Sequence, residues 1–332
     1  MDMQGRLGRL RAAGLRQDVV LLILFCAMVA AFSLVNPRFF SVRAMANILQ
    51  DFCPVMLMAI GQTFVIASRG IDLSVGSVLG LAGVTMALVI RAANGGGFDP
   101  ALAITLGLAA AVAVGAVAGL VNGLLITRCG LVPFVATLVT MGAGAGFSLV
   151  LTGGTQIAGA PKAVIQIGNA TFLGALTLPV AIVLAITVMS WAVLSRTRFG
   201  RWTYAIGSNP FAARGSGIDV ERHLIRIYLL SGILSALAGA FVYFRLGSGS
   251  PLSGRGGELS AIAAAVIGGV SLSGGTGRLT GVIMGALITA SVLSGLILVG
   301  VQPNWQQIVV AALIALAVGV QGLGAREGRT YG

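Results

Sequence analysis

The chain has 332 residues, of which 57% are hydrophobic and only 9% are charged, whereas about 25% of the residues in soluble domains are charged. A water-soluble fold cannot bury that much apolar surface, and the 49 glycines follow no three-residue period, so soluble enzymes and collagen are excluded. The net charge of +12 fits cationic loops that orient a membrane protein, and no basic run interleaved with aromatic residues favours a nucleic acid. The composition predicts an all-α, polytopic integral membrane protein in contact with the lipid bilayer.

About ten transmembrane helices are predicted, because ten apolar runs follow one another and none alternates apolar with polar residues as a barrel strand would. The first run follows a cationic N-terminus like a signal peptide, but no small-residue cleavage site comes after it, so we expect it to be retained. The run at 259–272 is short and glycine-rich, and the sequence leaves open whether it crosses fully. The runs lie at 19–35, 44–68, 74–91, 101–126, 131–151, 175–195, 224–246, 259–272, 279–300 and 305–323.

The basic residues predict the side on which each loop lies. With the N-terminus inside, fifteen basic residues fall on inside segments and six on outside segments, as the positive-inside rule requires. We therefore expect two cytoplasmic tails, at 1–18 and 324–332. The transmembrane domain between them, at 19–323, includes a cytoplasmic loop at 196–222.

Glycine recurs every four residues at two places. Small-residue ridges let helix backbones approach closely where lipid supplies no hydrophobic driving force. Packing within one subunit is the simpler interpretation, and a contact between two subunits is the alternative. The ridges are Gly115, Gly119 and Gly123, and Gly277, Gly281 and Gly285.

An inverted repeat is possible, because two similar segments open spans that are five apart. They are 70–74 (GIDLS) and 256–260 (GGELS). An odd separation means that the two segments enter from opposite faces, as in many transporters.

The sequence offers little material for catalysis or metal binding. The only lysine, Lys162, does not follow a glycine, so there is no Walker A motif, and the LSGG segment at 272–275 has no such loop to act with. Three cysteines and one histidine lack metal-ligand spacing. We expect no catalytic residue, no metal and no cofactor bound by this chain.

Charged residues at mid-membrane are not predicted, since Asp51 and Arg245 lie near span ends and can reach the headgroups. The absence of charged residues at mid-membrane argues against an ion-coupled carrier. Uncharged polar residues could line a path for a hydroxyl-rich solute, although hydrogen bonding between helices is the simpler role for any one of them, and capping is the simpler role for Asp72. The candidate path residues are Gln62, Asp72, Asn122, Thr137 and Thr140.

The 196–222 loop predicts a short helix. Asn209 is a good N-cap, Pro210 suits the first helical position, Ala212 and Ala213 extend the helix, and glycines such as Gly217 end it. Such a helix between two spans could dock a partner or could be an ordinary ordered loop.

Four stretches resemble the ribose-type permease family of bacterial ABC importers, the transmembrane subunits that serve monosaccharides. They lie at 70–77, 122–138, 207–232 and 261–277. The chain departs from the family at Arg69, where a glycine is frequent.

The resemblance implies a bacterial inner-membrane permease that works with three partners. These are a cytoplasmic ABC ATPase that binds ATP and Mg, a periplasmic sugar-binding protein, and a second permease copy or a related permease. ATP binding would pull the cytoplasmic loops together and rotate the permease halves. The ATPase-coupling residues would be Asn209, Pro210, Ala212, Ala213, Arg214, Gly217 and Ile218.

Other functions stay open from the sequence. The cargo could be a nucleoside, a branched-chain amino acid or a signalling furanose, and an autonomous ion-coupled carrier is a further alternative. The outside loop at 153–173 is a candidate contact for the binding protein. Neither the sugar nor the choice between homodimer and heterodimer follows from the residues.

Overall fold

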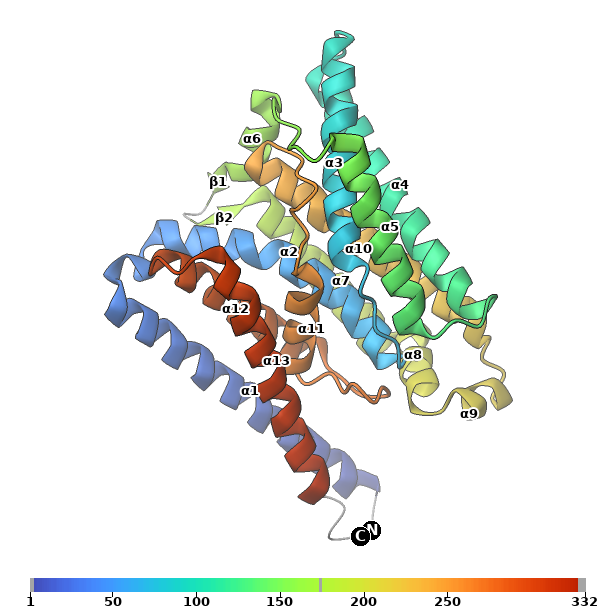
Figure 1. Cartoon of the computed structure of the whole chain (residues 1–332). Coiled ribbons are helices and arrows are strands. Elements are labelled where there is room, and N and C mark those ends of the chain that lie inside the picture. Colours follow the sequence, from blue (N-terminus) through green and yellow to red (C-terminus); the bar gives the residue numbers. More distant parts are fainter. Residues whose placement is uncertain (1–2, 173–174, 328–332) are drawn as a thin grey trace.

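The structure, a computed structural model, describes residues 3–172 and 175–327. Within these ranges the chain is helical almost throughout (Figure 1). The sheet found there is a hairpin of β1 (Thr171–Phe172) and β2 (Leu176–Thr177), paired antiparallel. The predicted all-α fold class is confirmed.

The helices are numbered in chain order, and one short 3-10 helix, η1, joins the first two. Their bounds are α1 (Met3–Val35), η1 (Pro37–Phe40), α2 (Val42–Ala67), α3 (Val75–Gly95), α4 (Pro100–Thr127), α5 (Pro133–Thr152), α6 (Lys162–Asn169), α7 (Leu178–Arg196), α8 (Arg198–Ser208), α9 (Pro210–Gly215), α10 (Val220–Leu246), α11 (Gly257–Ile267), α12 (Leu279–Leu298) and α13 (Pro303–Glu327).

Among the described residues, eight helices are long and apolar enough to cross a bilayer, namely α1, α2, α3, α4, α5, α7, α10 and α12. Two further apolar helices are shorter, α11 and the stretch Asn304–Gly319 of α13. The chain is therefore a multi-pass membrane protein, and its described residues hold eight long spans, where nine long runs and one shorter run were predicted.

α11 is short because glycines end it. Gly268 is its C-cap residue, and Gly269 adopts a φ of 86°, which favours glycine and breaks the helix. Eleven residues rise about 17 Å, roughly half of the hydrocarbon thickness. The run predicted at 259–272 is thus a half-length helix followed by irregular backbone.

Two contacts define the ends of the bundle. Asp18 of α1 pairs with Arg278 at 2.8 Å, and Asn36 donates to the carbonyl oxygen of Leu298 at 2.9 Å. We call the first end the terminal end, because α1 begins there and α13 ends there (Figure 1). The second is the opposite end. The structure thus places the start of α1 and the end of α13 on one side of the bundle.

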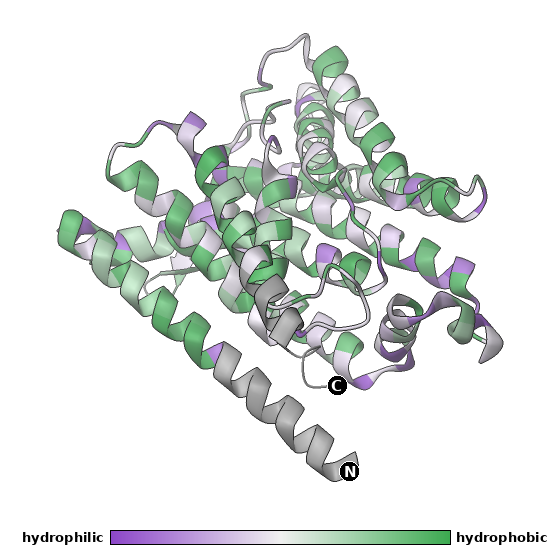
Figure 2. Ribbon diagram, turned by 60° about the horizontal axis from the view of Figure 1, so that its bottom comes forward, coloured by the Kyte–Doolittle hydropathy of each residue, from purple (hydrophilic) through white to green (hydrophobic). Residues whose placement is uncertain are grey.

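The core is built around α2 and α10. In the most apolar window of each span, 78% of α2 and 72% of α10 is buried, against 22% of α4 and 6% of α1. The long helices are mostly hydrophobic, and hydrophilic residues gather in loops and at helix ends (Figure 2). The outer helices therefore present apolar side chains to the position of the lipid.

Both glycine ridges pack within the chain. A Cβ added at Gly115 or Gly119 of α4 would lie 2.3 Å from a carbonyl oxygen of α10. A Cβ at Gly281 or Gly285 of α12 would lie 2.1 Å from a carbonyl oxygen of Gly268 or of α11. These helix backbones can approach each other so closely only because glycine has no side chain.

The two segments that resemble each other in sequence also meet in space. A Cβ at Gly76, just after the first segment, would lie 2.4 Å from the carbonyl oxygen of Gly254 and close to the carboxylate of Glu258. The backbone before α11 therefore packs directly on the start of α3.

Candidate functional site

A buried polar cluster surrounds the loop between α2 and α3. Asp72, 1% exposed, accepts on Oδ1 the backbone N–H and the hydroxyl of Ser74, at 2.9 and 2.6 Å. Its Oδ2 accepts the hydroxyl of Ser231 of α10 at 2.8 Å. Burial raises the pKa of the Asp72 carboxyl above its usual value, because the charged form loses its hydration, while the three donors act in the opposite direction.

Other predicted path residues converge on the same loop from α2, α4 and α5. Gln62 donates from Nε2 to the carbonyl oxygen of Asp72, and Asn122 donates from Nδ2 to Oγ of Ser74 at 2.8 Å. Thr137 donates to another carbonyl oxygen of this loop at 3.1 Å. The structure thus brings four of the five candidates together around one loop.

Three details differ from the prediction. Thr140 donates instead to the carbonyl of Ala136 in its own helix, at 3.3 Å. The N-cap residue of α3 is Ser74, so Asp72 holds the N–H of the cap residue and does not cap the helix itself. Ser231 was not among the predicted path residues, although it lies in the 207–232 stretch that resembles the family.

The cluster is closely packed. Gln62 and Thr137 are 0% exposed, and a Cβ added at Gly70 would lie 2.3 Å from the hydroxyl oxygen of Tyr228. That hydroxyl and Oδ1 of Asn122 have no hydrogen-bond partner among the described residues. The buried polar cluster therefore closes the bundle at this level.

A cavity of about 880 Å³ opens nearer the opposite end. Its wall on α2 extends from Gln50 to Met58, and the start of α11, from Gly257 to Ser260, also lines it. The 252–256 loop, Leu79 of α3 and residues of α10, α12 and α13 form the remaining walls. Among the described residues that line the cavity, none is one of the five predicted path residues.

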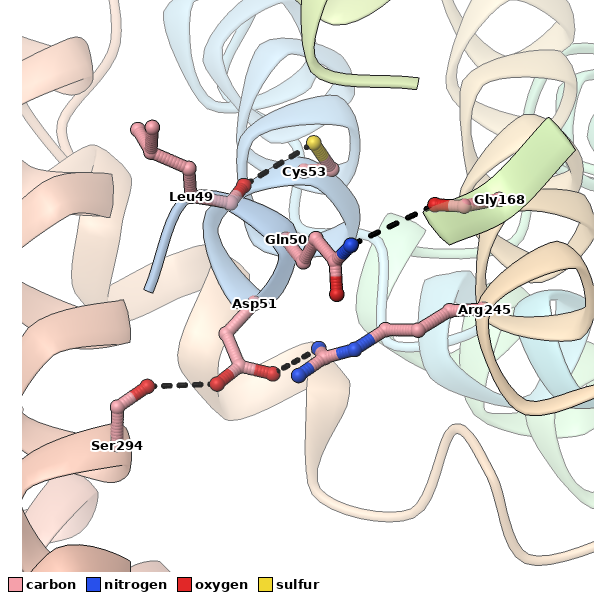
Figure 3. A network of polar contacts seen from close by, with 7 residues as sticks. All are labelled: Leu49, Gln50, Asp51, Cys53, Gly168, Arg245 and Ser294. Carbon is pink, nitrogen blue, oxygen red and sulfur yellow. Dashed lines mark hydrogen bonds and ion pairs between the residues drawn. The ribbon is translucent and has the colours of Figure 1, made fainter. Parts of the chain in front are cut away.

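An ion pair lines this cavity (Figure 3). Arg245 of α10 donates from Nη1 to Oδ1 of Asp51 of α2, and Ser294 of α12 donates to Oδ2 at 2.6 Å. The two charged side chains are 27% and 32% exposed, respectively. The sequence places each residue near a span end, and the structure adds that the opposite charges pair, because the last turn of α10 lies beside α2.

At the terminal end, the 196–222 loop forms the predicted short helix. Oδ1 of Asn209 accepts two backbone N–H groups of the first turn of α9, at 3.0 and 3.1 Å. Pro210 is the first helical residue and Gly215 the last. Gly217 follows with a φ of 82°, a conformation that favours glycine.

α9 combines a packed face with an exposed one. Ala213, 4% exposed, and Ile218 join a small apolar cluster with α8 and α10. Arg214 lies 3.6 Å from Glu221, and both are about half exposed. Phe211 is 80% exposed, and sequence reasoning did not select it, although a large apolar residue on a polar helix is a signal.

α8 connects α9 with the membrane helices. A Cβ added at Gly207 would lie 1.8 Å from the carbonyl oxygen of Ala67, and the same oxygen accepts the N–H of Gly275 at 2.9 Å. Tyr204 donates its hydroxyl to the carbonyl of Gly277 at 2.7 Å. The end of α8 thus contacts both the end of α2 and the irregular segment that follows α11.

The backbone conformation at Arg69 explains why glycine is frequent at this position in the family. Its φ is 72°, in the left-handed region where glycine carries no steric penalty and other residues do. Its Nε donates to the carbonyl of Ser273 at 3.0 Å. The backbone turn requires this conformation, and the side chain offsets part of its cost.

Comparison with known proteins places these features in context. Residues 44–318 match the family described as the permease component of a branched-chain amino acid transport system. The ribose import permease of Bacillus subtilis is 43% identical over 293 residues, 88% of each chain. The ribose import permease of Escherichia coli K12 is 40% identical over 90% of this chain and 91% of its own. The fructose import permease of Rhizobium meliloti is 38% identical over 91% and 84%, respectively. No solved structure matches the chain significantly.

Proposed function

The chain belongs to the permease-component family described for branched-chain amino acid transport systems, and from this premise we propose that it is the transmembrane permease subunit of a binding-protein-dependent ABC importer for a monosaccharide. The similar chains named for ribose and fructose import support a sugar over an amino acid. A nucleoside, a signalling furanose and a branched-chain amino acid are the competing cargoes.

We place the protein in a bacterial inner membrane with the terminal end in the cytoplasm. The basic residues support this orientation, because most of them lie in segments that belong to the terminal end. The 153–173 segment, which includes α6, then lies on the periplasmic side. It is the proposed contact for the sugar-binding protein.

The observation that carries the proposal is the exposed helix α9 and its connection to the core. Phe211 and Arg214 offer an apolar and a cationic group on a capped, rigid helix. A cytoplasmic ATPase that binds ATP and Mg would dock there, and no nucleotide site is needed in this chain. The coupling segment comprises Asn209, Pro210, Ala212, Ala213, Arg214, Gly217 and Ile218, to which the structure adds Phe211.

Movement of α9 would reach the membrane helices through α8. Gly207 touches Ala67 at the end of α2, and Gly275 is bonded to the same carbonyl. A pull on α9 therefore acts on α2 and on the segment after α11 together. A second permease, identical or related, completes the path, and the halves rotate as rigid bodies.

For the candidate path residues we propose a place at the closed inner part of the path. Gln62, Asp72, Asn122 and Thr137 hold the loop between α2 and α3. Thr140 lies one turn further along α5. When the halves rotate, the loop would move and expose these polar groups to the solute.

Reconstitution tests the proposal. Vesicles that contain this chain, the ATPase and the sugar-binding protein with which it co-purifies should accumulate a monosaccharide only when ATP is present on the ATPase side. Vesicles with the chain alone should take up none. Autonomous uptake, or a binding protein whose ligand is an amino acid or a nucleoside, would contradict the proposal.

A further inference from the structure

The cavity and the buried polar cluster share one face of α2. Asp51, Val55 and Met58 line the cavity, and Gln62 of the cluster follows Met58. Spacings of four, three and four residues place these four side chains on one helical face. The step from Met58 to Gln62 is about 6 Å along the axis. The open cavity and the closed cluster are therefore consecutive sections of one line through the bundle.

The polar groups of the cavity are unusual for a position within spans. Asp51 lies nine residues inside α2, about 14 Å along the helix axis from its start. Arg245 lies in the last turn of α10, so the pair joins a residue well inside one span to a residue at the end of another. Arg245 contacts Asp51 through Nη1, whereas a guanidinium has five N–H donors. Donors and acceptors thus remain on the pair for a second partner.

Neighbouring side chains hold the Asp51–Arg245 ion pair in place. Ser294 of α12 donates to Asp51 at 2.6 Å, and Asn169 of α6 donates to the backbone carbonyl of Arg245 at 3.0 Å. Gln50 reaches the carbonyl of Gly168 at 3.5 Å (Figure 3). Contacts from α12 and α6 therefore fix the pair, and its geometry is organised before any solute arrives.

The inner end of the cavity is formed by a broken helix. Residues 247–256 enter as irregular backbone, and the N-cap residue of α11, Gly256, has a φ of 80°. Irregular backbone at membrane depth is tolerated where it lines a cavity. Interrupted helices of this kind mark solute sites in transporters.

From these observations we propose that the cavity is the outward-facing solute site, in which Arg245 and Asp51 bind adjacent hydroxyl groups of a monosaccharide and Gln307 binds from the α13 wall. The inference rests on the proposed function and specifies its binding residues. A carboxylate that accepts and a guanidinium that donates, already paired with each other, suit a neutral ligand whose hydroxyls do both. A charged solute would compete with one member of the pair.

The size and the apolar walls agree with this ligand class. About 880 Å³ falls within the range of small-molecule sites, roughly 300–1,000 Å³, which combine apolar walls with a few polar groups. Pro54, Val55 and Phe241 supply the apolar surface. They can cover the C–H face of a sugar ring while the polar groups bind its edge.

The test uses vesicles with the complete importer and labelled D-ribose as the probe. The double variant Asp51→Asn with Arg245→Gln removes both charges and leaves no unpaired one. We expect ribose uptake per ATP hydrolysed to fall by about tenfold or more, the effect of lost hydrogen bonds to charged groups. Basal ATP hydrolysis should stay within about twofold, because α9 and α8 are unchanged.

A second pair of variants decides the matter if the double variant does not assemble. Gln307→Leu alters the cavity wall, and the Gln307 side chain makes no hydrogen bond to the other described residues. We expect about a threefold loss of ribose uptake and an altered ribose-to-fructose preference. Gln302→Leu is the matched control, because Gln302 is exposed and does not belong to the described lining. It should transport as the unaltered protein does.

The outcomes separate the two proposals. If the unaltered complex takes up no monosaccharide, the proposed function fails. If that complex transports ribose and the cavity variants match it in rate and sugar preference, the proposed function stands and this inference is overturned. The solute would then follow another route, such as one between two copies of the chain.

Discussion

Ser231 and Asp72 are 159 positions apart in the chain, yet the hydroxyl of Ser231 donates to Oδ2 of Asp72 at 2.8 Å inside the protein. Ser231 belongs to α10, and Asp72 to the loop between α2 and α3. The bond thus ties this loop to the most buried part of the bundle. A carboxylate oxygen without a donor would be far more costly here than at a surface, because the surroundings are poor in water.

Ser231→Ala should therefore destabilise the protein by about 1–3 kcal/mol, the cost of a buried acceptor left without its donor. Ser235→Ala is the matched control, since Ser235 is equally buried but donates only to the carbonyl of Ser231 in its own helix, at 2.8 Å. Its loss should change stability by less than about 0.5 kcal/mol. Thermal unfolding of the purified protein in detergent measures both, and equal effects would contradict this role for Ser231.

The pKa of Asp72 predicts a pH effect. Burial raises this pKa, so the folded protein binds the proton more readily than the unfolded chain does. The contribution of such a group to stability is fully present below its unfolded pKa and is lost as the pH rises through its folded pKa. Asp72→Asn should remove this component. The difference in unfolding temperature between about pH 4 and about pH 8 should be smaller in the variant, and an unchanged difference would refute the assignment.

Composition and local signals were enough for the fold class and for α9. Apolar runs without alternation become helices whatever their neighbours are, because backbone groups in lipid must be satisfied within the segment. Asn209 and Pro210 determine the start of α9 through contacts within a few residues. The sequence identified the 259–272 run as short but left open whether it crosses, because apolar composition continues beyond Ile267 and only the left-handed turn at Gly269 ends the helix.

Local signals in the sequence also predicted part of the candidate site. Gln62 and Asn122 stand out as amides in apolar spans, and the structure brings them to one loop. Asp51 and Arg245 were not predicted to form a site, because each, taken alone, can reach the headgroups from a span end. Their pairing joins positions 194 apart, and no local pattern contains that information.

The close contact of α4 with α10 predicts a contrast between two glycines. Gly119→Ala would place a methyl group 2.3 Å from the carbonyl oxygen of Tyr228, so the helices must separate, at a cost of about 1–3 kcal/mol. Gly146→Ala on α5 would meet no atom within 4 Å. That change should be neutral or stabilising by up to about 1 kcal/mol, through helix propensity. Thermal unfolding again gives the comparison, and similar values for both variants would contradict the packing role.

Arg214 provides the sharpest test of docking at α9. Its pair with Glu221 has a separation of 3.6 Å and is about half exposed, and such pairs contribute at most about 1 kcal/mol to stability. Arg214→Glu should therefore leave folding nearly unchanged while it weakens ATPase docking and lowers uptake per ATP hydrolysed. The swapped variant, Arg214→Glu with Glu221→Arg, restores the local pair but not the position of the cation. If the charge at 214 meets the ATPase, the swap will not rescue coupling. Full rescue by the swap would show that Arg214 acts only through Glu221, and normal transport by Arg214→Glu would remove the residue from the coupling surface.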